Sequence, residues 1–146
     1  IIDLLNEETI KLNLESETKD NVIKELVELM DRSNRLKNKD KVLEAVYARE
    51  EKFSTGIGMG VAIPHAKSSS VKKPTIAFGK SKIGIDFDSS DNEPAYLFFL
   101  IAVPEKSSDE HLQILSKLSR RLMHEELRNS LKSAEMSAEI IEILDK

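Results

Sequence analysis

Apolar residues recur with a helical period in several stretches of the chain. A helix is predicted over residues 18–33, with Thr18 as its N-cap, and a second helix is predicted to begin at Asp40. A long third helix is expected after the capping-box pair Ser107 and Glu110, with one or two more in the tail. The first two helix predictions rest on the apolar residues Val22, Ile23, Leu26, Val27, Leu29, Met30, Val42, Leu43, Val46 and Tyr47.

Shorter stretches have the patterns of β-strands. Ile10–Leu14 alternates apolar and polar residues, Val61–Ile63 and Pro74–Gly79 are short apolar runs, and Ile83–Phe87 is a further strand or an irregular edge. Ala95–Val103 is apolar on both faces, so it is expected to be a central strand covered on both sides. Helices before and after a block of strands predict a layered α/β domain with a mixed sheet.

Composition narrows the classes of function. The chain has 146 residues, which are expected to form one domain over residues 1–146, and 40% of them are hydrophobic and 33% charged. The net charge of −4 and the lack of a basic cluster argue against nucleic acid as a partner. The sequence contains no cysteine, which excludes disulfides, thiolate chemistry and cysteine-based zinc sites.

Neither a membrane-spanning segment nor a signal peptide is predicted from the sequence. The longest apolar run, roughly Ala95 to Val103, is far too short to cross a bilayer. The first residues lack a basic segment followed by an apolar one. The protein is therefore expected in the cytoplasm, where it would serve a membrane only as a peripheral or tethered module.

The segment Ser54, Thr55, Gly56, Gly58 and Gly60 is the first candidate binding element. Its glycines lie after a helix and before a strand, the reverse of the order in dinucleotide-binding folds, and no GK[ST] motif follows. ATP and NAD binding by this loop are therefore excluded. Backbone N–H groups and two hydroxyls suit a phosphoryl-binding loop. The alternative is that the glycines only end the helix and form a tight turn.

His65 is the candidate nucleophile. Pro64 restricts Ile63 to an extended conformation, which predicts a stiff strand with the imidazole at its end. A neutral imidazole is a good nucleophile near pH 7, and a hydrogen bond to one ring nitrogen sets the tautomer. The alternative is an ordinary packed or surface histidine.

His111 is predicted in the first turn of the long helix, on the face that carries Leu115, Leu118 and Leu122. The N-terminus of a helix favours anions through its free N–H groups and its dipole. His111 is therefore a second site candidate, and the alternative is a hydrogen-bonded core histidine. No chemistry is assigned to His124, near the other end of that helix.

Arg49 is a candidate charge clamp for a phosphoryl group, because its planar guanidinium binds such groups in a bidentate manner. The alternative is a solvated residue in the charged run from Arg49 to Lys52. Asp86, Asp88 and Asp91 do not fit a calcium loop, because the required glycine and closing glutamate are missing. No metal site and no cofactor are predicted.

Together these residues resemble a known family. Glu50, six further residues and then IGMGVAIPHA resemble the signature of EIIA domains of the bacterial sugar phosphotransferase system (PTS). The resemblance is to the fructose/mannitol class, which includes the nitrogen-regulatory member, and HLQILSKLSRRL is similar to that family's second motif. The likeness covers essentially the whole chain. It implies a three-layer α/β/α sandwich around a mixed sheet of about five strands.

The resemblance also implies a mechanism. The family's histidine at the position of His65 is phosphorylated on Nε2 by the phosphocarrier HPr and then phosphorylates a sugar-specific EIIB domain, which can be fused to or associated with a membrane EIIC domain. His111 and Arg49 match the family's second active-site histidine and its arginine. Met59 departs from the acidic or polar residue of many relatives, which bears on docking. The expected apolar rim is Ile57, Met59 and Val61.

Three functions remain open at this stage. The first is a phosphocarrier for sugar uptake, most simply of the fructose type. The second is a regulatory module like the nitrogen-related members, whose phosphorylation state decides which proteins it binds. The third is an EIIA-like domain of a transcription regulator. All three use His65, and the neighbouring domains or genes would separate them.

Overall fold

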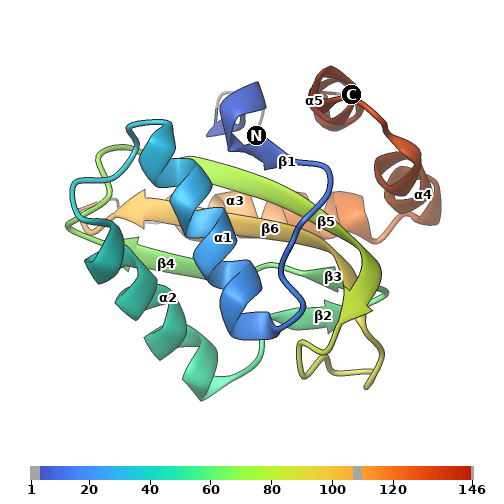
Figure 1. The fold of residues 1–146 in the computed structure, drawn as a ribbon, viewed down its shortest axis with the longest axis horizontal. Helices are drawn as coiled ribbons and strands as arrows, with labels where there is room; N and C mark the ends of the chain where they lie inside the picture. The colour runs from blue at the N-terminus through green and yellow to red at the C-terminus, as the bar shows by residue number, and fades with distance from the viewer. Residues whose placement is uncertain (1–3, 107–109, 146) are drawn as a thin grey trace.

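The structure is a computed structural model that describes residues 4–106 and 110–145, with only the backbone described at Glu110 and His111. One six-stranded sheet lies between two groups of helices (Figure 1). The elements in chain order are the 3-10 helix η2 (Glu7–Thr9), β1 (Ile10–Lys11), α1 (Lys19–Arg32), α2 (Lys39–Lys52), β2 (Gly56–Gly58), β3 (Val61–Ala62), β4 (His65–Ser68), β5 (Thr75–Ile85), β6 (Ala95–Pro104), α3 (Glu110–Leu122), α4 (Glu125–Ser133) and α5 (Ser137–Asp145).

Side-chain caps fix where the first two helices begin. Thr18 Oγ1 accepts the Asn21 N–H at 3.3 Å, which confirms the predicted start of α1. α2 begins one residue before the predicted Asp40, because the Asn38 side chain accepts the Lys41 N–H at 3.2 Å. The tail forms two helices, α4 and α5, as predicted. The expected cap at Ser107 lies outside the described residues.

The sheet has the order β1-β5-β6-β3-β2, with β4 also paired to β6. β5 and β6 are antiparallel, as are β2 and β3, whereas β1 is parallel to β5 and both β3 and β4 are parallel to β6. The predicted mixed sheet and the central position of 95–103 are therefore confirmed. The sheet has six strands rather than about five: the sequence analysis did not identify β2 and β4 as strands, and it counted part of β5 as a possible further strand.

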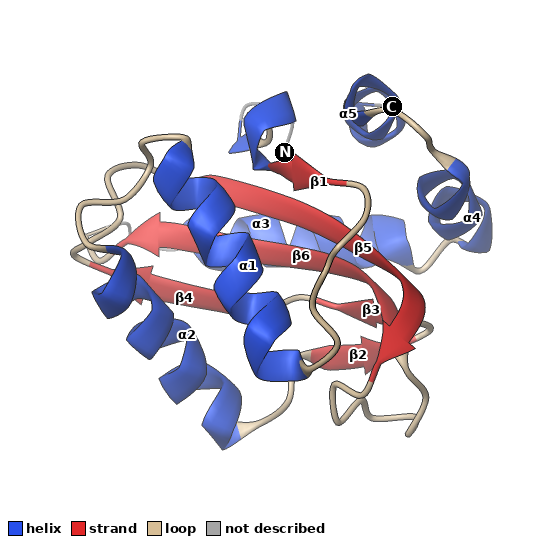
Figure 2. Ribbon diagram, viewed as in Figure 1, coloured by secondary structure: helices blue, strands red, loops and turns tan. Residues whose placement is uncertain are grey.

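Alternate residues of β6 face two separate cores. Phe98, Leu100 and Ala102 pack in the core with α1 and α2, whereas Leu97, Phe99, Ile101 and Val103 pack in the core with α3, α4 and α5. Each core holds one tilted pair of aromatic rings, Phe87–Phe98 at 5.5 Å and Phe78–Phe99 at 4.9 Å between centroids. Figure 2 shows α1 and α2 in front of the sheet and α3 behind it, so the three layers are confirmed.

β3 and β4 follow one line along β6 in a single register. Val61 is opposite Leu97, and His65, four residues further on, is opposite Ile101, four residues beyond Leu97. The strand is interrupted at Pro64, which has no N–H to donate, although the Pro64 carbonyl accepts the Ile101 N–H at 3.0 Å. His65 is therefore the first residue of β4, and not the end of a strand as predicted.

Ile83–Phe87, expected to be a further strand or an irregular edge, does not form a separate strand. β5 continues without a break from Thr75 to Ile85, and its register against β6 shifts between Lys80 and Ile85. Gly84 has φ +82° there, and a Cβ at that position would lie 2.9 Å from the Tyr96 ring. The glycine therefore allows β5 to bulge and continue against β6.

Candidate functional site

The imidazole of His65 is fixed by its own strand. Its Nδ1 lies 2.9 Å from the carbonyl oxygen of Ile63. A carbonyl oxygen only accepts hydrogen bonds, so Nδ1 carries the proton and the neutral ring has its lone pair on Nε2. Neighbouring residues in adjacent strands share a face of the sheet. Because His65 is opposite Ile101, its side chain lies on the α3 side, where it is partly buried.

The glycine-rich segment forms a β-hairpin. Gly56 pairs with Ala62, and the chain turns through Gly58, Met59 and Gly60, which have φ values of 90°, 59° and 77°. Three successive left-handed residues make a tight reversal that glycine adopts readily and methionine does not. The tight turn that was considered as the alternative is thus present. Along the sheet, this turn is further from His65 than Gly56 is.

The polar groups of Ser54 and Thr55 organise this hairpin. Ser54 Oγ donates to the Phe87 carbonyl at 2.6 Å, and the Thr55 N–H and hydroxyl each donate to the Glu50 carboxylate at 2.7 Å. The Gly56 N–H donates to Ser54 Oγ at 3.0 Å. These donors have acceptors within the protein. Phosphoryl binding by the glycines of the loop stays a prediction.

Arg49 lies in the last turn of α2, and its guanidinium reaches beyond the end of the helix. Its Nη1 donates to the Phe53 carbonyl at 2.9 Å, which uses one of its five N–H donors. This bond ties the guanidinium to the segment that enters the hairpin. The arrangement is compatible with a phosphoryl clamp, and that role stays a prediction.

The predicted position of His111 in the helix is confirmed, because its backbone lies in the first turn of α3. Its side chain is outside the described part of the structure, so its role stays a prediction. Leu118 and Leu122 on the same face are fully buried. His124 is exposed at the N-cap position of α4 and makes no side-chain capping bond.

Glu50 is a buried residue to which the sequence analysis gave no role beyond its place in the family signature and in the charged run after Arg49. It is 8% exposed, and Lys19 Nζ of α1 lies 3.1 Å from its Oε1. The helical spacing from Val42 through Val46 to Glu50 places it on the buried face of α2, and this spacing was the available signal. Glu50 therefore connects both front helices to the hairpin.

The expected apolar rim is partly wrong. Ile57 and Met59 are each 36% exposed, but Val61 is fully buried in the core under α3 and cannot contact a partner. The alternation of β3 against β6 turns Val61 inward. Phe53, at the end of α2, is 77% exposed and is an apolar surface residue that the analysis did not anticipate.

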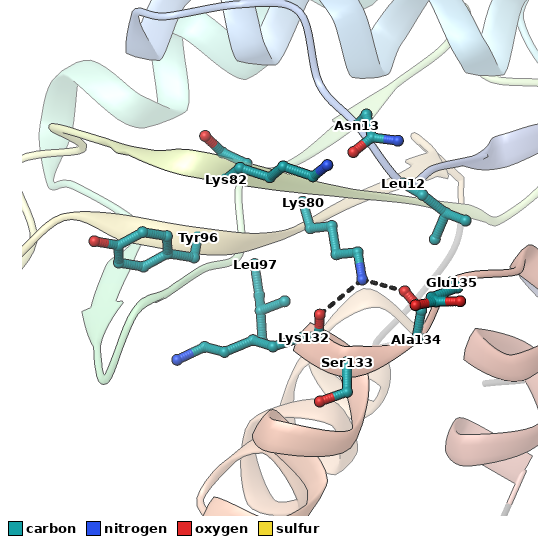
Figure 3. Close-up of a pocket in the computed structure, with 11 residues that line it drawn as sticks. Leu12, Asn13, Lys80, Lys82, Tyr96, Leu97, Lys132, Ser133, Ala134 and Glu135 are labelled. Carbon is teal, nitrogen blue, oxygen red and sulfur yellow. Dashed lines mark hydrogen bonds between the residues drawn. The ribbon is translucent and has the colours of Figure 1, made fainter.

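A groove of about 850 Å³ lies between the bend of β5 and the end of α4 (Figure 3). Lys80 Nζ donates there to the carbonyls of Leu131, Lys132 and Ala134, so it caps α4. Burial lowers the pKa of Lys80. Lys132 Nζ lies 5.6 Å from the centroid of the Tyr96 ring. The lysine at the centre of this groove thus has a structural role.

Among the side chains that the structure describes, which exclude those of Glu110 and His111, no three His, Asp or Glu residues are grouped to hold a metal ion. No helix within residues 4–106 and 110–145 has both the length and the apolar character needed to cross a membrane.

Comparison with known proteins gives a consistent result. The family described as "Phosphoenolpyruvate-dependent sugar phosphotransferase system, EIIA 2" matches residues 3–146. The PTS system fructose-specific EIIABC component of Bacillus subtilis is 49% identical over 146 residues, which are 100% of this chain but only 23% of that protein. The PTS system fructose-specific EIIA component of Haloferax volcanii is 44% identical over 137 residues, 94% of this chain and 89% of that protein.

A solved structure supports the same assignment. The crystal structure of nitrogen regulatory protein IIA-Ntr from Neisseria meningitidis has a TM-score of 0.91 and 36% sequence identity, and covers 98% of this chain and 97% of that one. The chain therefore belongs to the EIIA 2 family of the phosphoenolpyruvate-dependent sugar phosphotransferase system.

Proposed function

We propose that this chain is a phosphocarrier in which His65 accepts a phosphoryl group from phospho-HPr and passes it to a sugar-specific EIIB domain. The observation that carries the proposal is the bond between His65 Nδ1 and the Ile63 carbonyl, which directs the lone pair to Nε2. Family membership supplies the reaction class, and a fructose-type sugar follows the names of the two relatives above.

The transfer needs no cofactor. The lone pair on His65 Nε2 attacks phosphorus, and the bond between phosphorus and the donor's nitrogen breaks, its electron pair returning to the donor's imidazole. His65 gains positive charge as the new bond forms, and the Ile63 carbonyl stabilises the proton that stays on Nδ1. Delivery to EIIB follows the same course: a nucleophile of the EIIB domain attacks phosphorus, and the bond between phosphorus and His65 Nε2 breaks, its electron pair returning to the imidazole of His65. In the step from HPr to His65 one P–N bond replaces another, so little free energy is lost.

The incoming group adds up to about two negative charges. We assign their stabilisation to Arg49 and to the first turn of α3, where the backbone N–H groups and His111 are located. Phosphoryl transfer depends mainly on such positioning and charge stabilisation. Donor and acceptor must each reach His65 in turn, so we expect small, transient interfaces that use exposed apolar residues such as Phe53 and Ile57.

The proposal places the reaction in the cytoplasm, where HPr would meet the chain and the EIIB domain could be fused to it or to a membrane EIIC domain. The name of the Bacillus subtilis relative, an EIIABC component, supports the EIIB partner. The second candidate function is regulation by phosphorylation-dependent protein binding. It is supported by the fold and the 36% identity shared with the nitrogen regulatory protein of Neisseria meningitidis.

Intact-protein mass spectrometry tests the proposal. The chain would be incubated with phosphoenolpyruvate, enzyme I and HPr, beside a His65→Ala variant of verified fold. We expect one acid-labile phosphoryl group on the parent chain and none on the variant. Addition of a fructose-type EIIB domain should then remove the group. Phosphorylation that EIIB does not discharge would favour the regulatory function, and an equally phosphorylated variant would refute the site.

A further inference from the structure

The mechanism above makes no use of Glu50, although its carboxylate is one of the few buried charges in the described residues. Isolated buried carboxylates are costly, and this one is compensated by Lys19 at 3.1 Å. Lys19 also donates to the Phe87 carbonyl at 3.4 Å and lies 3.6 Å from Asp88. The carboxylate is thus held between the start of α1, the end of α2 and the loop after β5.

A continuous series of hydrogen bonds runs from Glu50 to the imidazole. The carboxylate accepts both the N–H and the hydroxyl of Thr55 at 2.7 Å. The Thr55 carbonyl accepts the Ile63 N–H at 3.0 Å. The Ile63 carbonyl then accepts Nδ1–H of His65 at 2.9 Å. Each residue in the series therefore fixes the position of the next one.

We propose that Glu50 is a positioning residue for His65, which through Thr55 and Ile63 keeps the imidazole in the tautomer whose Nε2 is the nucleophile. The two bonds to Thr55 hold the base of the hairpin against α2. This places the Ile63 carbonyl oxygen beside Nδ1 of His65, and only a protonated Nδ1 can donate a hydrogen bond to that oxygen. The part of this inference that concerns phosphoryl transfer rests on the proposed function, whereas the part that concerns the tautomer does not.

Two variants at position 50 and one control at position 51 test the proposal. Glu50→Ala removes both acceptors of Thr55. Glu50→Gln keeps a carbonyl oxygen for the Thr55 N–H and an amide that can donate to its hydroxyl. Glu51→Ala removes the same charge from the neighbouring exposed position of α2. If Glu50→Ala does not fold, the pair Lys19→Met/Glu50→Ala leaves no charge unpaired and takes its place.

The first readout is the ¹⁵N NMR spectrum of the His65 ring in the unphosphorylated chain, which reports the tautomer. We expect Glu50→Ala to raise the Nε2–H population, and Glu50→Gln and Glu51→Ala to keep the parent spectrum. The second readout is the phosphorylation kinetics. In Glu50→Ala, kcat should fall by about tenfold to a hundredfold, with the KM for phospho-HPr within about twofold, since misplacement by about 1 Å costs that much.

A folded Glu50→Ala, or the folded double variant, with the parent tautomer and kcat would overturn the proposal. A lower stability alone would not support it, because a purely structural residue would leave the tautomer unchanged. If the parent chain accepts no phosphoryl group from a competent HPr, the proposed function fails. The tautomer spectra then decide the positioning role by themselves.

Discussion

The backbone N–H of Met59 donates a hydrogen bond to the carboxylate of Asp91, with 3.0 Å between nitrogen and oxygen. Met59 is the non-glycine residue in the left-handed turn of the hairpin, a conformation that costs roughly 1–2 kcal/mol for an L-residue. The other Asp91 oxygen accepts the Glu93 N–H at 3.0 Å. The loop after β5 therefore braces the hairpin tip and offsets its backbone strain.

Removing this brace should produce a pH-dependent loss of stability. The N–H groups of Glu93 and Met59 lower the pKa of Asp91 below its ordinary value of 3.8. The ionised carboxylate thus stabilises the fold above about pH 3.8, and this contribution is lost as pH falls through the lowered pKa. Asp91→Asn should lower the melting temperature at pH 6–8, and its difference from the parent chain should shrink below pH 4.

Asp86→Asn is the matched control for that experiment. Asp86 belongs to the same loop, but its carboxylate accepts the nearby Asp88 N–H and makes no described bond to the hairpin. It should change the melting temperature much less at neutral pH. If the two variants lose equal stability at every pH, the hydrogen bond between Asp91 and the Met59 N–H makes no contribution of its own to the stability of the fold.

A methyl group at Gly56 should force the hairpin and the loop apart. A Cβ at this position would lie 2.4 Å from Ser89 Oγ and 3.0 Å from Ser89 Cα. We expect Gly56→Ala to lower the free energy of unfolding by about 1–3 kcal/mol, the usual cost of overpacking. Adding Ser89→Gly should recover part of the loss, as measured by urea unfolding. A double variant as unstable as the single one would show that the contact with the Ser89 side chain is not the source of the strain.

Arg49→Lys tests the phosphoryl clamp. Lysine keeps the charge but loses the planar fork and the bond to the Phe53 carbonyl. We expect the phosphorylation rate of His65 to fall by about tenfold, since a hydrogen bond to a charged group contributes about 1.5–3 kcal/mol and its lower end corresponds to roughly that factor. Arg120→Lys, on the exposed side of α3, is the control and should leave the rate unchanged. Equal rates for the two variants would make Arg49 a surface residue.

Much of the fold could be predicted from local patterns. Thr18 and the apolar period after it locate α1, and the doubly apolar run over 95–103 identifies the central strand. β2 and β4 could not be found in this way, because they have three and four residues and contain polar or glycine positions. Such short strands exist through their pairing with neighbouring strands, which a local pattern does not contain.

In the candidate site, the residues that could be predicted are those whose role is signalled by their immediate neighbours in the sequence. His65 follows a proline and a buried strand, and the bond to Ile63 gives it the predicted fixed tautomer. The burial of Glu50 was missed because the neighbouring residues in the sequence are also charged, whereas its burial is compensated by Lys19 from another helix. Val61 was assigned to the rim because the direction of its side chain depends on the pairing with β6.

The most direct test of the account is the identity of the phosphorylated nitrogen. The chain, labelled with ¹⁵N in its histidine rings, would be phosphorylated through enzyme I and HPr and observed by ¹⁵N and ³¹P NMR. We predict a phosphorus–nitrogen coupling at Nε2 of His65, with a proton retained on Nδ1. Coupling at Nδ1 of His65, or at His111 or His124, would contradict the central claim.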